Sequence, residues 1–160
     1  MPTGAYQLLS SVQSGWPEHT LLLADFSSLP PSMAAGASLA ANAPLVASDG
    51  GERDHSSYTD VPGQADIFFP TDFEWLAAAY QLAAPEEEAA RPAVVVAEGS
   101  TTKAFGQSRC EVHPSKQFLT QHGEVEMTRT RTGFNPMVDD YANTCFFVGR
   151  RATASAHVTR

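Results

Sequence analysis

The sequence predicts an α/β fold in which short apolar strands alternate with amphipathic helices. Three apolar runs bounded by turn residues are typical of buried strands, and they lie at 19–26, 93–99 and 144–150. Helical patterns lie before and between these runs, and the clearest apolar stripe follows residue 71. Because a mean sheet has about five or six strands, the three runs indicate half of an α/β sheet.

The first part of the chain predicts a helix followed by a buried strand. Apolar residues within 5–14 recur at near-helical spacing, and Gly15 and Pro17 end that pattern. The run HTLLLADF at 19–26 has a continuous apolar centre, which is typical of a parallel strand buried on both faces. Asp25 ends its apolar centre, and ligands bind at the carboxyl ends of such strands in open α/β sheets.

Two turn-rich segments follow this strand. Residues 27–44 are rich in Ala, Ser and Pro, and residues 48–63 in Gly, Ser and Asp, which predicts two long loops, and 43–48 between them predicts a brief strand. Long loops in a compact domain are often functional. The second loop carries His55 and Tyr58, but no motif around them supports a role as general base.

The strongest local signal is the segment ADIFFPTDFEWL at 65–76. It predicts an extended entry followed by a helix, in which Thr71 and Glu74 form a capping box with Thr71 as the N-cap. Asp72 then places negative charge in the first turn, which favours the helix dipole. The apolar stripe of this helix consists of Phe73, Leu76, Ala77 and Tyr80.

The C-terminal part predicts two further helices between two strands. The run AVVVAEG at 93–99 is the second buried strand, and 115–123 predicts a helix closed by Gly123 in the left-handed C′ conformation. Asn135 is a candidate N-cap for a short helix that begins with Pro136. The third strand is the run TCFFVGR at the end of this part.

Composition and charge argue against several classes of function. A formal net charge of −8 repels phosphate backbones, which argues against a nucleic-acid-binding protein. Cys110 and Cys145 form no CxxC pair and show no metal-ligand spacing with the histidines, so we expect reduced structural thiols and no metal site. The apolar runs are far shorter than the roughly 20 residues of a membrane span, and the N-terminus shows no targeting signal.

A series of motifs resembles a known family. HTLLLADFSSLP, a loop containing NAPLV, QADIFFPTDFEWL, an F-L-x-x-x-G helix and NPMVDDYANTCFFVG occur in this order over about residues 5–150. They are similar to the MidA-type methyltransferases, which include the mitochondrial complex I assembly factor seven family. The resemblance implies the C-terminal half of a class I, Rossmann-like methyltransferase fold that uses S-adenosyl-L-methionine (SAM).

The resemblance also implies a strand assignment and a domain organisation. HTLLLADF would be the fifth strand of the methyltransferase fold, AVVVAEG the sixth and TCFFVGR the antiparallel seventh. Residues 1–150 would form the partial methyltransferase domain and 151–160 a flexible tail. The glycine-rich loop that holds SAM in this family has no counterpart in the sequence, so we expect the chain alone to be inactive.

Acidic residues are the site candidates, because carboxylates orient and neutralise a guanidinium group. The resemblance implies catalytic roles for Asp66 and Asp72, and the position of Asp25 at a strand end predicts a contact with the cofactor. Each residue also has a structural interpretation: a turn at Asp25, an Asx turn at Asp66 and a helix cap at Asp72.

The resemblance implies a type II protein arginine methyltransferase of mitochondria. Such an enzyme symmetrically dimethylates an arginine of a respiratory complex I subunit, which would be the protein partner, and supports assembly of the complex. An alternative is a noncatalytic binding or assembly protein that keeps the substrate-side half of the fold. A soluble α/β domain of unrelated function fits the composition equally well.

Overall fold

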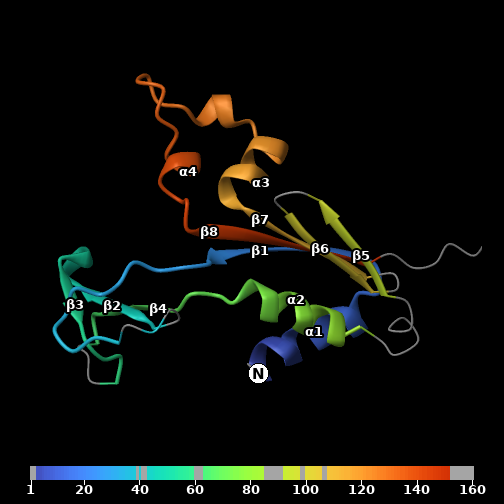
Figure 1. Ribbon diagram of the computed structural model, residues 1–160, viewed down its shortest axis with the longest axis horizontal. Coiled ribbons are helices and arrows are strands. Elements are labelled where there is room, and N and C mark those ends of the chain that lie inside the picture. The colour runs from blue at the N-terminus through green and yellow to red at the C-terminus, as the bar shows by residue number, and fades with distance from the viewer. Residues whose placement is uncertain are drawn as a thin grey trace, which may run out of the picture. The chain divides into compact units, whose positions relative to one another are not determined.

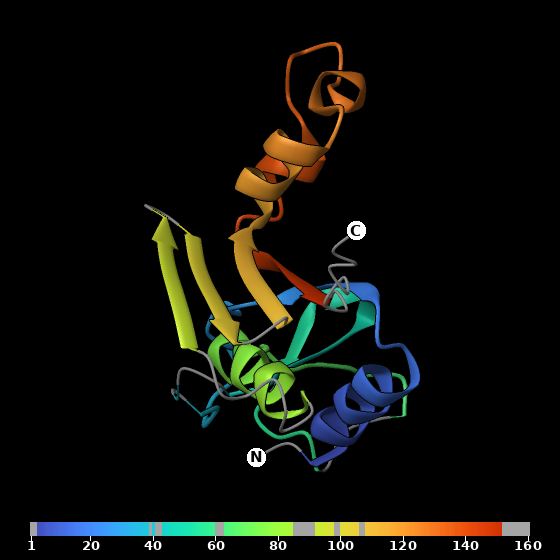
Figure 2. The same cartoon turned by 90° about the vertical axis from the view of Figure 1, so that its right-hand side faces the viewer.

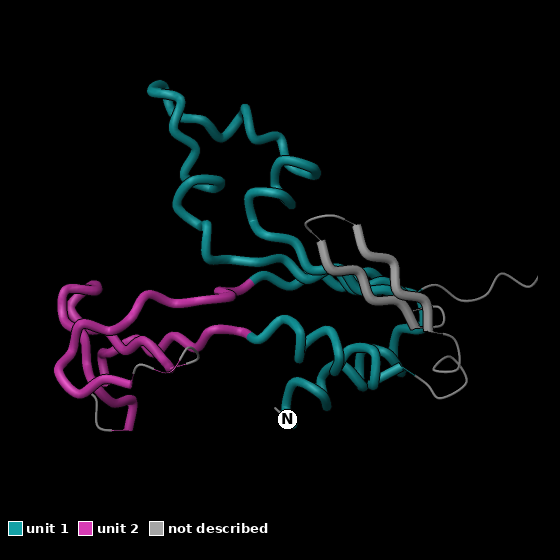
Figure 3. The backbone as a smooth tube through the Cα atoms, in the orientation of Figure 1, with its two compact units in different colours: residues 1–24, 72–160 teal, residues 25–71 magenta. Residues whose placement is uncertain are grey.

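The computed structural model describes residues 3–38, 40, 43–59, 63–84, 92–97, 100–105 and 108–151 (Figure 1). The chain divides into two compact units. Unit 1 consists of residues 1–24 and 72–160, and unit 2 of residues 25–71, so that unit 2 is inserted into the sequence of unit 1 (Figure 3).

Unit 1 is built on a five-stranded sheet with the order β1-β8-β7-β6-β5. The pairs from β8 to β5 are all antiparallel. The strands are β1 (His19–Phe26), β5 (Pro92–Ala97), β6 (Ser100–Phe105), β7 (Ser108–Pro114) and β8 (Thr144–Arg151). The register of β7 on β8 places Val112 opposite Phe147 and His113 opposite Phe146, so successive pairs face opposite sides of the sheet.

The helices α1 (Thr3–Gly15) and α2 (Phe73–Leu82) pack against each other, and α2 covers one face of β7 and β8 (Figure 1). Tyr80 is fully buried at the centre of this layer, edge-to-face with Phe147 at a centroid distance of 5.4 Å. Its hydroxyl hydrogen-bonds the Nε2 of His19 at 2.8 Å. The buried cluster consists of Leu9, Phe73, Ala77, Ala79, Tyr80, Cys110 and Phe147.

An excursion between β7 and β8 rises from the ends of these strands (Figure 2). It contains α3 (Ser115–His122), the 3₁₀ turn η2 (Val125–Thr128) and α4 (Pro136–Asp139). Phe118 anchors it by stacking on Phe146, with ring centroids 4.3 Å apart. Asn135 caps α4 by accepting from the Met137 N–H, which confirms the predicted cap.

Unit 2 contains a small antiparallel sheet with the order β3-β2-β4. Its elements are β2 (Leu45–Ser48), the 3₁₀ turn η1 (Asp49–Gly51), β3 (Arg53–His55) and β4 (Asp66–Phe68). The tight turn between β2 and β3 needs positive φ at Gly50 (71°) and Gly51 (95°), which glycine adopts without steric cost. The predicted brief strand is therefore confirmed as β2.

The α/β class is confirmed, but the arrangement of the strands differs from the prediction. The described sheets are small and their assigned pairings are antiparallel, so a Rossmann-like fold stays a prediction. The prediction that 19–26 is buried on both faces is wrong, because Leu22 is 52% exposed while Leu21 and Leu23 pack on the core. Within the described residues β1 is an edge strand, and only its α-helical side is covered.

The strands β3, β6 and β7 were not predicted from the sequence. The strand expected as the sixth of a methyltransferase fold, β5, lies at the far edge of the sheet, and β7 is the strand next to β8. Cys110 and Val112 alternate with polar residues in β7, which a period of two would have revealed. Of the predicted tail at 151–160, Arg151 is the last residue of β8, and 152–160 lies outside the described residues.

Two helix-end predictions are also wrong. Asp72, not Thr71, is the N-cap of α2, because its side chain accepts from the Trp75 N–H at 3.0 Å. Gly123 ends α3 in an extended conformation with φ −107°, so it is not a left-handed C′ glycine. Its N–H instead donates to the Leu119 carbonyl at 2.8 Å, and a Cβ there would meet that same oxygen.

Candidate functional site

Asp25 ties together the two ends of unit 2. Its Oδ2 accepts from the Thr71 hydroxyl at 2.5 Å, and its Oδ1 accepts from the Phe26 N–H at 2.8 Å. The Thr71 N–H donates to the Phe26 carbonyl at 2.7 Å. Two hydrogen bonds therefore join residues 25–26 to residue 71. Because an ionised carboxylate has about four acceptor positions, exposed Asp25 can still accept from a ligand hydroxyl or cation.

Asp66 is the first residue of β4 and is exposed. It lies opposite Ala47 of β2, and Phe68, two residues on, shares its face of the strand. Phe68 is 36% exposed and contacts Phe26 edge-to-face at a centroid distance of 6.2 Å. Asp66 has no hydrogen-bond or ion-pair partner among the residues that the structure describes, so its carboxylate is open to a cationic ligand.

Asp72 belongs to unit 1, where it caps α2. The predicted helix-cap role of Asp72 is therefore confirmed, since its Oδ1 accepts from the otherwise unpaired Trp75 N–H. The structure brings Asp25 and Asp66 into unit 2 and places Asp72 outside it. The predicted catalytic roles of Asp66 and Asp72, and the cofactor role of Asp25, stay predictions.

The sequence predicted that His55 lies in the loop 48–63, but the structure places it in β3 of unit 2. Its Nε2 lies 2.9 Å from the Oγ of Ser48, a side chain that is buried at the end of β2. His55, Val46 and Tyr58 line a pocket of about 120 Å³ that is partly open to solvent. The Gly50–Gly51 turn after an apolar run was the sequence signal for this strand pair.

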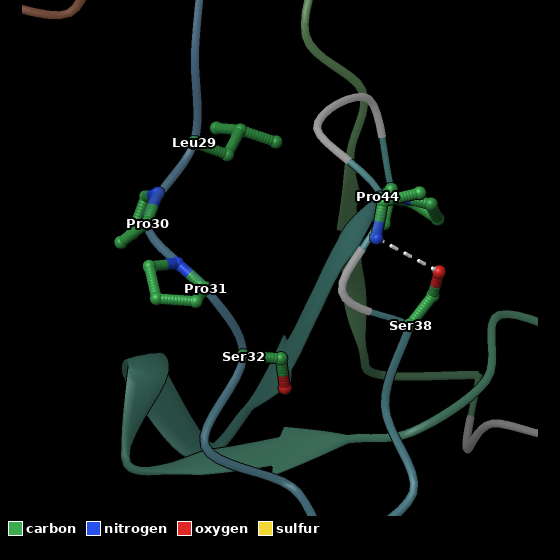
Figure 4. Close-up of a pocket in the computed structure, with 8 residues that line it drawn as sticks. Leu29, Pro30, Pro31, Ser32, Ser38 and Pro44 are labelled. Carbon is green, nitrogen blue, oxygen red and sulfur yellow. Dashed lines mark hydrogen bonds between the residues drawn. The ribbon is translucent and has the colours of Figure 1, made fainter.

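A second pocket of unit 2, of about 160 Å³ and also partly open, is lined mainly by proline, serine and alanine (Figure 4). Pro30, Pro31 and Pro44 form its walls, and the Ser38 hydroxyl accepts from the Ala40 N–H at 3.3 Å. Among the residues that the structure describes, no Asp, Glu, Lys or Arg side chain lines either pocket, so the described walls offer apolar contact and neutral hydrogen bonds.

The described residues do not assemble a complete site for a metal or for SAM. They contain no group of three or more His, Cys, Asp or Glu side chains placed to hold a metal ion. Asp25 at the end of β1 suits a hydroxyl donor, but neither pocket supplies a charged partner for the amino-acid part of SAM. We therefore derive no chemical step through the methyl donor.

Comparison with known families decides the class of protein. Residues 1–88 match the model of the family described as "Putative S-adenosyl-L-methionine-dependent methyltransferase". The chain belongs to this family. The match spans more than half of the chain and contains α1, all of unit 2 and α2. Comparisons with curated proteins and with solved structures gave no match.

Membership identifies the reaction class and the cofactor. Members of this family are SAM-dependent methyltransferases, so the predicted transferase class and the predicted cofactor are confirmed at that level. The MidA-type methyltransferases, which the sequence resembles, are a narrower group, and the resemblance to them is compatible with membership in this family. None of the helices in the described ranges is long and apolar enough to cross a membrane.

Proposed function

We propose that this protein acts in SAM-dependent methylation of an arginine side chain of a protein. The observation that carries the proposal is the family match over residues 1–88, which contains all three candidate carboxylates, Asp25, Asp66 and Asp72. By resemblance to the MidA-type family, we propose type II chemistry: symmetric dimethylation of an arginine on a respiratory complex I subunit, in mitochondria, in support of complex I assembly.

The exposed carboxylate of Asp66 suits the guanidinium group in charge and in hydrogen-bonding capacity. Arginine presents a planar fork of five N–H donors, and a carboxylate accepts two of them in parallel. Fixing the fork also fixes the direction in which the reacting nitrogen points, which is the main protein contribution to a methyl transfer. Asp66 would thus orient the substrate.

A noncatalytic assembly protein is the second candidate. It is favoured by the exposed aromatic side chains of unit 2, because Tyr58 and Phe69 are 50% and 54% exposed and contact each other edge-to-face. Exposed aromatic residues are enriched at protein interfaces. In this case the chain would bind a complex I subunit without modifying it.

The test replaces the gene in the organism of origin with variants and measures two quantities. Mass spectrometry reports symmetric dimethylarginine on complex I subunits, and native electrophoresis reports the amount of assembled complex I. We expect Asp66→Asn to reduce the modification severalfold. Glu52→Gln, which removes an equally exposed carboxylate of unit 2, should leave the modification unchanged.

Deletion of the gene distinguishes the enzyme from the assembly protein and can also reject both. If deletion of the gene removes assembled complex I while the remaining subunits keep their dimethylarginine, the assembly protein is correct and the enzyme is not. If deletion changes neither quantity, both candidates are wrong. Calorimetry of the purified chain with SAM tests the expectation of inactivity, because micromolar binding would show that this chain holds the cofactor by itself.

A further inference from the structure

Unit 2 carries most of the net negative charge of the protein. Residues 25–71 contain six acidic side chains and one basic side chain, a formal charge of −5, whereas the whole chain has a net charge of −8. Three of the carboxylates have partners within unit 2: Asp49 pairs with Arg53, Asp54 accepts from the Met33 N–H, and Asp25 accepts from Thr71. The field of this unit therefore attracts cations and repels anionic surfaces.

The strand β4 exposes its side chains on both faces. Asp66 and Phe68 lie on one face, and Ile67, 41% exposed, lies on the other. Phe26 extends the aromatic surface next to Phe68, and the Tyr58–Phe69 pair lies immediately beyond the end of the strand. We call the set Asp66, Ile67, Phe68, Phe69, Tyr58 and Phe26 the β4 surface.

We propose that the β4 surface is a docking site for an arginine-bearing, basic segment of a partner protein. The proposal rests on the proposed function and names the residues of unit 2 that recognise the substrate. The arginine guanidinium pairs with the Asp66 carboxylate and stacks on the ring of Phe68. Because β4 is an edge strand of the described sheet of unit 2, a segment that lies along its edge reaches both faces, and the apolar neighbours of that arginine contact Ile67 and the Tyr58–Phe69 pair on the other face.

The chemistry of the surface selects this occupant over others. A guanidinium is planar and weakly hydrated, so its face can stack on an aromatic ring while its N–H groups donate within its own plane. An ammonium group has no flat face, so it cannot stack and donate in this way at the same time. The formal charge of −5 on unit 2 excludes anionic lipid headgroups and nucleic acids. Two residues on one face of a strand are about 7 Å apart, which places Asp66 within reach of a guanidinium on Phe68.

The experiment measures binding of short peptides to the full-length ¹⁵N-labelled chain by NMR, without SAM. The probe is a flexible peptide of Gly, Ser and Val with one central arginine, compared with the same peptide carrying citrulline or lysine. Citrulline has the shape of arginine but no charge. We expect the arginine peptide to shift the amide signals of β4 and to bind at least about threefold more tightly than the citrulline peptide.

Variants locate the site. Asp66→Asn keeps the side-chain shape and Phe68→Leu keeps an apolar side chain without the ring. Each should weaken the arginine peptide about two- to fivefold, and together about tenfold, because exposed ion pairs and cation–π contacts each contribute about 0.5–1 kcal/mol. Glu52→Gln should leave the affinity unchanged, since this carboxylate lies next to the η1 turn and outside the β4 surface.

Three results would overturn the proposal: equal shifts with the citrulline peptide, equal weakening by Glu52→Gln, or self-association of the chain that Phe68→Leu abolishes. The last result would assign the β4 surface to a second copy of this chain. Because the assay contains no methyl donor, its failure would leave the methylation proposal standing. If the chain binds the arginine peptide but its deletion leaves the dimethylarginine unchanged, the docking site stands and the methylation proposal is wrong.

Discussion

Gly149 lies against Tyr80 and Phe147 in the core of unit 1, so Gly149→Ala is a direct test of the packing there. A Cβ at Gly149 would lie 2.7 Å from Cζ and 2.9 Å from Cε2 of Tyr80, and 3.0 Å from Cε1 of Phe147. Ordinary carbon–carbon contacts are about 3.5–4.0 Å, so the methyl group overlaps both rings. The Tyr80 ring cannot withdraw, because it is fully buried and its hydroxyl is held by His19.

The cost follows from this overlap. Overpacking a well-packed core destabilises by about 1–3 kcal/mol, and replacing a strand glycine returns about 0.5–1 kcal/mol of backbone entropy. The difference between these two terms is a net loss of about 1 kcal/mol in the free energy of unfolding, which for a chain of this size lowers the Tm by about 2–4 °C. Urea denaturation followed by tryptophan fluorescence measures the first quantity and calorimetry the second.

The chain offers a matched control and a matched rescue. Gly4→Ala adds the same methyl group in α1, where nothing lies within 4 Å, so it should be neutral or stabilise by about 0.5–1 kcal/mol. Tyr80→Leu removes the ring atoms that the methyl group meets, so the double variant should lose less stability than the sum of the two single variants. Additive losses, or a Gly149→Ala protein as stable as the wild type, would refute the packing argument.

The remaining predictions concern two helix caps. Asp72→Ala should destabilise the protein by about 1 kcal/mol in urea denaturation, as loss of an N-cap does. Asp72→Asn keeps the acceptor oxygen and should be nearly neutral in the same measurement. If the Asp72→Asn variant loses the dimethylarginine of the substrate, the charge of Asp72 is needed for function. Asn135→Ala should cost about 2 kcal/mol, because the buried amide donates to the Val125 carbonyl at 2.7 Å and accepts from Met137. Asn135→Ser retains an N-cap acceptor and should recover about half of that loss by the same measurement. An Asn135→Ala variant as stable as the wild type would contradict the role of Asn135 as a cap.

Local sequence signals predicted the elements that depend on near neighbours. The apolar stripe of α2 is confirmed, since Phe73, Ala77 and Tyr80 are buried, and the Asn135 cap is confirmed by its bond to the Met137 N–H. These features follow from helical spacing and from the acceptor chemistry of one side chain. The choice between Thr71 and Asp72 as the cap of α2 was not local, because the Thr71 hydroxyl is taken by Asp25, 46 residues away.

The positions of the candidate site residues were also partly predicted from the sequence and partly decided by strand pairing. The sequence placed carboxylates at a strand end and beside an extended segment, and the structure finds Asp25 at the end of β1 and Asp66 at the start of β4. It did not predict that residues 25–71 form a separate unit, nor that His55 meets Ser48 across two strands. Both depend on strand pairing, which is set by contacts between distant residues.

By itself, the sequence determined the α/β class, the limits of most helices and apolar strands, the acidic character of the inserted segment and the membership in a methyltransferase family. Only the tertiary structure decided that β7, rather than the more apolar β5, lies next to β8, and that one face of β1 stays open at Leu22. The physical reason is that hydrophobic periodicity records which side of an element is buried, whereas neighbours in a sheet are chosen by backbone hydrogen bonds that every residue type can make.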